Sequence, residues 1–206
     1  KMVFDKVLNR LIDLELIKRD EIQRIDATHM IADIAIPTVV ALVKKGIREI
    51  LKPLKGQKPQ VYENIIKKID TDEYTREKVN QADEGRLDIE KRKVKLVKVV
   101  TDARNMLKGL EDVHVSRGLR KRIELLQRIL RENVNESGAK PQEREYKDKP
   151  KDILVSPIDE DARYGCKSDT KRFVGYKANI TESVENRFIT NIDVMRGNRP
   201  DGEPKN

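Results

Sequence analysis

The sequence predicts an α+β protein, because stretches with helical periodicity and stretches with strand alternation occupy separate parts of the chain. Apolar and polar residues alternate from Phe173 to Thr181 and from Phe188 to Met195, as in the two strands of an antiparallel hairpin. From Arg24 to Ile36 the chain is apolar on both faces and runs into a proline, which predicts a central, buried strand. The long stretch between these strands has helical periodicity instead.

Three helices are expected before the middle of the chain. Met2 to Ile17 spaces its apolar residues at intervals of three and four, so we expect an amphipathic helix that packs on the strand after it. Thr38 opens a second helix, Val39 to Leu51, which Pro53 and Gly56 are expected to close. Val61 to Ile69 predicts a third, shorter helix.

Two longer helices follow, Leu87 to Leu110 and Ser116 to Asn133, the second with Ser116 as a candidate cap. Because only Glu111 to Val115 separates them, we expect an antiparallel hairpin resembling a short coiled coil. Basic residues on its outer face are candidates for phosphate contacts, but such residues are more often a solvated helix surface. They are Lys91, Arg92, Lys93, Lys95, Lys98, Arg120, Lys121 and Arg122.

Composition narrows the classes of partner. The 206 residues include 44 basic and 36 acidic ones, and the net charge of +8 favours a polyanion such as nucleic acid, although a solvated charged surface has the same composition. An aromatic share of 4% argues against a module that stacks single-stranded bases. Cys166 is the sole cysteine, which excludes an internal disulfide. The single cysteine fits a reducing, cytoplasmic compartment, and without an apolar run of about 20 residues we expect no membrane segment.

The chain is expected to divide into a helical part and an α+β part built from two distant segments. Residues from Glu136 to Asp152 are rich in Lys, Glu, Pro and Gly without apolar periodicity, which predicts a mobile linker. The expected divisions are an N-terminal helix (1–20), a core made of 21–36 and 153–206, a helical insertion (37–135) and a linker (136–152).

Asp26 has the strongest claim to chemistry, because it is an acid within an apolar strand. Cleavage of phosphodiesters is commonly catalysed by two Mg²⁺ ions about 4 Å apart, and carboxylates on rigid elements hold such ions. The competing interpretation is an ordinary strand acid bonded by Thr28 or by backbone amides. His29 and Asp33 are expected on the opposite strand face or at the strand exit, in structural roles.

Three ordered motifs strengthen the claim of Asp26. Asp-Ala-Thr-His stands at Asp26 to His29, Ser-Pro-Ile-Asp-Glu-Asp-Ala-Arg at Ser156 to Arg163, and Gly-Tyr-Lys at Gly175 to Lys177. In this order they resemble the catalytic domain of bacterial insertion-sequence transposases of the Asp-Asp-Glu (DDE) type. The strand from Phe188 and the Gly-Asn turn at Gly197 are also similar to that family. The resemblance covers both ends of the chain well and the helical middle loosely.

The resemblance implies a partial ribonuclease H-like mixed sheet, of which this chain supplies the first three strands, interrupted by a long helical insertion. It implies that Asp26 is the first catalytic acid and a Mg²⁺ ligand in a two-ion site. The second and third acids are not found in this sequence, so we expect a fragment that is inactive in isolation. The parent enzyme would cleave and transfer transposon ends in DNA recombination, in the bacterial cytoplasm.

The resemblance also suggests DNA contacts for Lys177, Arg163 and Lys171, since cations on such a face attract phosphates whatever the sequence. Arg163 is as readily explained by a structural ion pair with Asp159 or Asp161. The alternative function is a non-catalytic helical module for DNA binding or oligomerisation. An incomplete sheet exposes a strand edge, so self-association as a homo-oligomer is expected.

Overall fold

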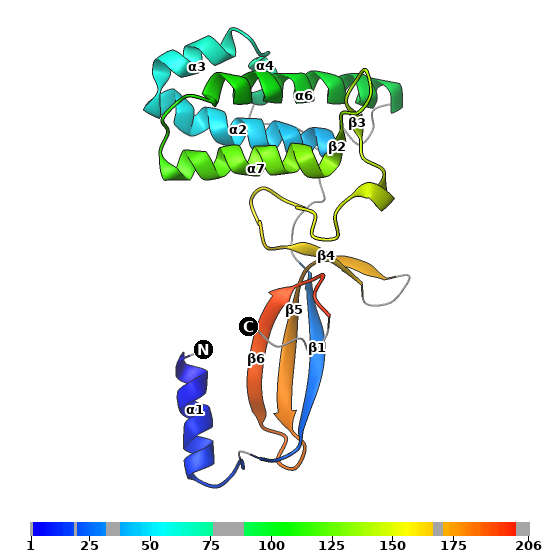
Figure 1. The fold of residues 1–206 in the computed structure, drawn as a ribbon. Helices are drawn as coiled ribbons and strands as arrows, with labels where there is room; N and C mark the ends of the chain where they lie inside the picture. The colour runs from blue at the N-terminus through cyan, green and yellow to red at the C-terminus, as the bar shows by residue number, and fades with distance from the viewer. Residues whose placement is uncertain (1, 19, 32–37, 76–88, 167–170, 201–206) are drawn as a thin grey trace. The chain divides into compact units, whose positions relative to one another are not determined.

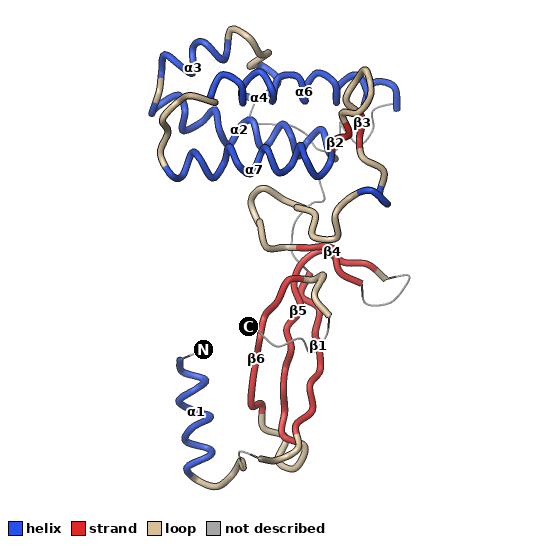
Figure 2. Tube along the Cα trace, in the orientation of Figure 1, coloured by secondary structure: helices blue, strands red, loops and turns tan. Residues whose placement is uncertain are grey.

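The structure, a computed structural model, describes residues 2–18, 20–31, 38–75, 89–166 and 171–200. The chain divides into two compact units, which we call the sheet unit (Lys1–Ile34 with Asp161–Asn206) and the helical unit (Ala35–Glu160). In the part of the chain that the structure describes, the sheet unit contains a four-stranded antiparallel sheet and one helix, whereas the helical unit contains the other helices and one short hairpin, which confirms the α+β class (Figures 1 and 2). None of the described helices combines the length and the apolar character that crossing a membrane requires.

Strand β5 (Arg172–Ser183) organises the sheet unit, because the other three strands all pair with it antiparallel. They are β1 (Gln23–Ile31), β4 (Arg163–Cys166) and β6 (Ile189–Arg196). The predicted hairpin of β5 and β6 is confirmed. Within the described residues β1 pairs with β5 alone, so the prediction of a central, buried strand is wrong: β1 is an edge strand whose side chains are exposed or half-buried.

Helix α1 (Met2–Asp13) forms as its apolar spacing predicts, but it buries none of its residues. Val3 and Val7, on the helix that was expected to pack on the next strand, are largely exposed. The helix ends where Glu15 adopts a positive φ of 56°, which turns the chain away from the helix axis. The predicted packing of this helix on β1 is therefore not found.

The helical unit is built around three long helices, α2 (Val39–Gln57), α6 (Ile89–Leu110) and α7 (Arg117–Asn133). The shorter helices α3 (Pro59–Ile66) and α4 (Asp72–Thr75) connect α2 towards α6. Both α6 and α7 pack chiefly on α2, which runs between them in the ribbon (Figure 1). The expected two-helix coiled coil is thus replaced by a three-helix arrangement in which α2 supplies the shared surface.

Two of the three long helices begin at side chains that the sequence identified. Thr38 Oγ1 accepts a hydrogen bond from the Ala41 amide at 3.2 Å, and Ser116 Oγ accepts one from the Leu119 amide at 3.4 Å. The expected end of α2 before Pro53 is wrong, because the helix continues through Pro53 and ends at Gln57, next to Gly56, the second residue expected to close it. Leu54, just beyond the proline, is completely buried, and this packing offsets the hydrogen bond that Pro53 removes.

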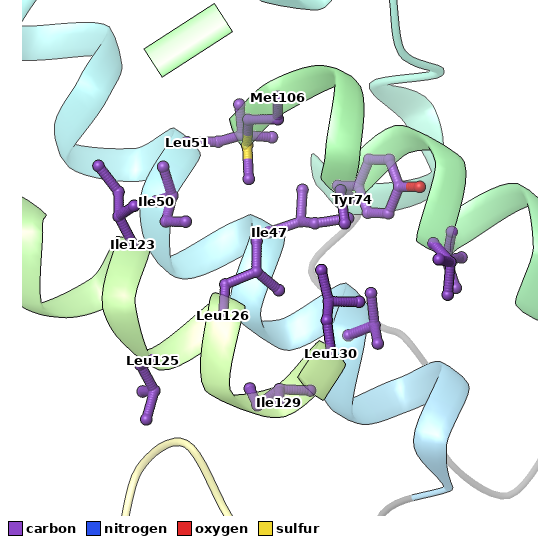
Figure 3. Close-up of a cluster of buried hydrophobic side chains, with 14 of the residues drawn as sticks. Ile47, Ile50, Leu51, Tyr74, Met106, Ile123, Leu125, Leu126, Ile129 and Leu130 are labelled. Atoms are coloured by element: carbon purple, nitrogen blue, oxygen red, sulfur yellow. The ribbon is translucent and has the colours of Figure 1, made fainter. Parts of the chain in front are cut away.

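Close approach of α2 and α7 forms the centre of the core. A Cβ on Gly46 would stand 2.8 Å from Leu126 Cδ1, so a larger residue at this position would force the Leu126 side chain to shift. Figure 3 shows the surrounding cluster, in which Ile47 and Ile50 of α2 and Leu126 and Ile129 of α7 are all completely buried. Aliphatic side chains form most of this core, as the low aromatic content requires.

A buried polar network ties the α4 region to α2 and α6. Tyr74 donates its hydroxyl to Asp102 Oδ2 at 2.6 Å, and burial, followed by this bond to a carboxylate, raises the pKa of Tyr74. Glu73 forms an ion pair with Lys44, which is itself buried. Burial alone would raise the pKa of Glu73, but the hydrogen bond and charge of Lys44 with the charges of Lys95 and Lys98 lower it.

The segment expected to be a mobile linker has local structure. Strand β2 (Val134–Asn135) pairs antiparallel with β3 (Gln142–Glu143), and a 3₁₀ turn, η1 (Tyr146–Asp148), follows. These residues belong to the helical unit. Backbone hydrogen bonds hold this polar segment in place. The Arg144 amide donates to the Asn133 carbonyl at 2.8 Å, which attaches the hairpin to the end of α7.

Candidate functional site

Asp26 lies in the middle of β1, opposite Ile180 of β5. Its side chain is exposed, and its Oδ1 accepts a hydrogen bond from the Ala27 amide at 2.9 Å. No described residue forms an ion pair with this carboxylate. The remaining lone pairs therefore face solvent, an arrangement that permits a ligand but does not require one.

The face of the sheet that carries Asp26 is largely apolar and open. Directly opposite residues of an antiparallel pair share one face, so Asp26, Ile180 and Ile192 form one row across three strands. Met30 and Val194 lie on the same face, and both are more than two-fifths exposed. Exposed and half-buried aliphatic side chains therefore flank the acid across the sheet.

The opposite face carries His29 and Lys177, which stand directly across from each other. Lys177 is buried, and its Nζ donates to the Arg199 carbonyl at 2.9 Å, which holds the turn after β6 against the sheet. His29 contacts the Phe173 ring edge-on, with ring centroids 4.7 Å apart. Both residues of this face have structural contacts, as the sequence suggested for His29.

Three glycines lie where β4, β5 and the turn after β6 approach one another, and one of them, Gly175, is the first residue of the Gly-Tyr-Lys motif. Gly175 has a φ of 147°, a conformation that other residues rarely adopt. A Cβ on Gly197 would lie 2.8 Å from the Gly175 carbonyl oxygen, and one on Gly165 would lie 2.3 Å from Phe173 Cζ. These glycines therefore allow β4, β5 and the turn after β6 to close around the Phe173 ring.

The other two candidates for DNA contact, Arg163 and Lys171, have different environments. Arg163 is completely buried, and its Nη1 donates to the Ala162 carbonyl at 2.9 Å, which favours the structural role left open by the sequence. Asp161, one of the partners expected for Arg163, accepts a hydrogen bond from Arg196 Nη2 at 2.6 Å. Lys171 is exposed immediately before β5.

The remaining residues of interest in the sequence are Ser156, His114 and Asp33. Ser156 Oγ accepts from the Ile158 amide at 3.2 Å, so the Ser156 to Pro157 step forms a local turn within the helical unit. His114 lies in the connection between α6 and α7. Asp33 falls outside the described residues.

The described residues do not fit a two-ion magnesium site. Among them, no group of three or more His, Cys, Asp or Glu side chains is arranged to hold a metal ion. Glu182, the acid nearest to Asp26 in register on the same face, bonds Arg24 and Arg187. Asp26 thus offers one carboxylate where two or three are needed, and we derive no catalytic step from it.

The outer lysines and arginines of the long helices are largely neutralised within the unit. Lys98 Nζ donates to Asp70 at 2.7 Å, a bond that raises the pKa of Lys98. Lys95 pairs with Glu73 at 3.5 Å, and Arg122 donates to the Glu49 carbonyl. This pattern supports a solvated, internally paired helix surface over a continuous phosphate-binding face.

One hollow of the helical unit is lined by three cations that the sequence did not single out, Arg104, Arg131 and Arg144. They lie on separate elements, and only the pairing of β2 with β3 brings Arg144 back to α7. No local sequence signal marks such a group.

Comparisons with protein-family models, with curated proteins and with solved structures give no significant match. What the fold and the site define is therefore a class: an α+β protein with an antiparallel sheet and a separate helical unit.

Proposed function

We propose that this chain supplies the first three strands and the first catalytic carboxylate of a ribonuclease H-like DNA transposase core. The connectivity supports the proposal: β1 is antiparallel to β5, and β5 is antiparallel to β6. The helical unit separates β1 from β4 and β5 in the sequence, as an insertion would. The motifs at Asp26, Ser156 and Gly175 occur in the order of the insertion-sequence family that they resemble.

The observation that carries the proposal is the position of the Asp26 carboxylate. It is exposed, it lies mid-strand, and the described residues leave it without an ion pair. Pairing with β5 fixes the backbone of β1 along nine consecutive positions, which limits the movement of this side chain. Asp26 would contribute one ligand to a magnesium site that needs further carboxylates, so the described part alone is expected to be inactive.

DNA contact in the sheet unit is proposed for Lys171 and withdrawn for Lys177 and Arg163. Lys177 and Arg163 are buried and bonded to backbone carbonyls. Lys171 stands exposed, where a cation attracts phosphate without regard to sequence. Its replacement by Gln should weaken DNA binding uniformly across DNA sequences.

The test is DNA nicking with Mg²⁺ by a protein that contains these residues together with the remaining acids. Asp26→Asn should abolish nicking and preserve DNA binding, because the change removes a ligand charge with little change in shape. Asp193→Asn, on the opposite face of the sheet, is the matched control and should retain nicking. Nicking that survives Asp26→Asn would remove Asp26 from the mechanism.

The alternative, a helical module for DNA binding or oligomerisation, is favoured by the independent core of the helical unit. The helical module and the transposase core predict different results for the same variants. Substitution of the exposed cations Lys91, Arg120 and Lys121 would abolish DNA binding, whereas Asp26→Asn would leave every activity unchanged.

A further inference from the structure

A hollow of about 600 Å³ opens in the helical unit where α6, α7 and the β2–β3 hairpin meet. Arg104 from α6, Arg131 from the last turn of α7 and Arg144 just after β3 all line it. Glu136 is the single acid among its lining residues. Three arginines and one glutamate therefore line the hollow, which gives it a local excess of positive charge.

The Arg144 side chain is anchored before any ligand binds. Its Nε donates to the Arg131 carbonyl at 3.2 Å, one of the carbonyls at the end of α7 that lack an intrahelical donor. This contact also opposes the negative end of the helix dipole, which would otherwise repel an anion. The two terminal nitrogens of Arg144 have no partner among the described residues, so they remain as oriented donors.

The other two arginines differ in how they are engaged. Arg131 directs no side-chain hydrogen bond or ion pair to any described residue. Arg104 forms an ion pair with Glu136. An incoming anion would therefore find Arg131 and Arg144 ready and would compete with Glu136 for Arg104.

The apolar lining of the hollow strengthens these charges. Leu107, Leu130 and Val134 also line it, and Leu130 and Val134 are nearly fully buried. Ionic hydrogen bonds beside such a surface are less screened than those on an open helix face. In this respect the hollow differs from the outer lysines Lys95 and Lys98, which neighbouring acids neutralise.

We infer that this hollow binds a phosphate group, supplied by a nucleic-acid backbone. The planar guanidinium group of arginine can donate two parallel hydrogen bonds to phosphate oxygens. Three such groups suit a phosphate, which has several oxygens, better than a carboxylate, which has two. The chain's net charge of +8 favours a polyanionic source. The inference adds a contact to the DNA partner proposed above, but it stands on the helical unit alone, so failure of Asp26 as a metal ligand leaves it unchanged.

The test is binding of the full chain to a short fluorescent DNA duplex, followed by anisotropy over a range of salt concentrations. Arg131→Gln and Arg144→Gln should each weaken binding several-fold and lower the slope of log K against log salt by about 1. Arg117→Gln, an exposed cation of α7 outside the hollow, is the matched control and should have a smaller effect. Helical circular dichroism verifies that each variant is folded.

A second variant tests the site in the opposite direction. Glu136→Gln should tighten binding, because it removes the carboxylate that competes for Arg104. Weaker binding by Glu136→Gln, or an equal loss in Arg117→Gln and Arg131→Gln, would overturn the inference. Competition experiments identify the source of the phosphate. Displacement of the duplex by inorganic phosphate or a dinucleotide at low concentration would overturn a nucleic-acid backbone as the source and assign a free phosphate compound. Displacement by polyglutamate as effective as that by unlabelled DNA would overturn phosphate recognition itself.

Discussion

Asp26 and Lys177 lie on opposite faces of one sheet, although the sequence motifs that contain them suggest a shared site. Asp26 stands across from Ile180, whereas Lys177 stands across from His29, three positions further along β1. An odd separation along regular strands places the two side chains on different faces. The acid is therefore available for a ligand, and the lysine holds the turn at Arg199.

This relationship predicts opposite consequences for the two substitutions. Lys177→Met should destabilise the sheet unit by about 1–3 kcal/mol, because it removes a buried, charged donor to a backbone carbonyl. Asp26→Asn should change stability by less than about 0.5 kcal/mol, since the side chain is exposed. Hydrogen exchange of the β5 amides measures both. A larger loss of protection in Asp26→Asn than in Lys177→Met would contradict the assignment.

The Tyr74 hydroxyl is expected to stabilise the helical unit. Tyr74→Phe leaves the buried Asp102 carboxylate without its 2.6 Å donor, which should cost about 1–3 kcal/mol. Tyr62→Phe is the control, because Tyr62 is half-buried and its described contact is with Lys55 over its ring. Urea unfolding followed by helical circular dichroism compares the two, and equal stabilities would show that the Tyr74 bond contributes nothing.

Two glycines of α2 should respond differently to the same substitution. Gly56→Ala should stabilise the protein by up to about 1 kcal/mol, because alanine favours helix and nothing lies within 4 Å of the added Cβ. Gly46→Ala should lose that gain, since its Cβ would press on Leu126 Cδ1. Thermal unfolding distinguishes them. A Gly46→Ala protein as stable as Gly56→Ala would mean that α2 and α7 separate readily.

The stability of the helical unit is expected to fall in acid through Glu73. Its folded-state pKa is lowered below the ordinary value of 4.5, so its contribution is present above that pH and is lost as pH falls through the folded value. Glu73→Gln should remove this part of the pH dependence. Denaturant unfolding between pH 3 and about pH 7 measures it. Glu111→Gln, in the exposed connection after α6, should keep the wild-type profile, and an unchanged profile in Glu73→Gln would refute the assignment.

Local signals predicted the elements, whereas packing decided their partners. The Ser116 cap and the alternation of β5 and β6 depend on neighbouring residues, so the sequence suffices to find them. The continuation of α2 past Pro53 depends on the burial of Leu54, which no local rule contains. The edge position of β1 likewise depends on which strands pair with it.

The candidate site shows the same division. The strand that carries Asp26 was predicted from its apolar sequence, but the side chains that share its face follow from the register with β5. A shift of one residue would exchange the two faces, so the sequence could not show that Lys177 and Arg163, which were expected to contact DNA, are buried.

The most direct test of the central claim is paramagnetic broadening of backbone amide signals by Mn²⁺, a stand-in for Mg²⁺, in a protein that contains these residues together with the remaining acids. The proposal predicts broadening that includes the Ala27 and Ile180 amides, is retained in Asp193→Asn and is lost from these amides in Asp26→Asn. Broadening that persists in Asp26→Asn, or its absence from these amides in the unsubstituted protein, would contradict the role of Asp26 as a metal ligand.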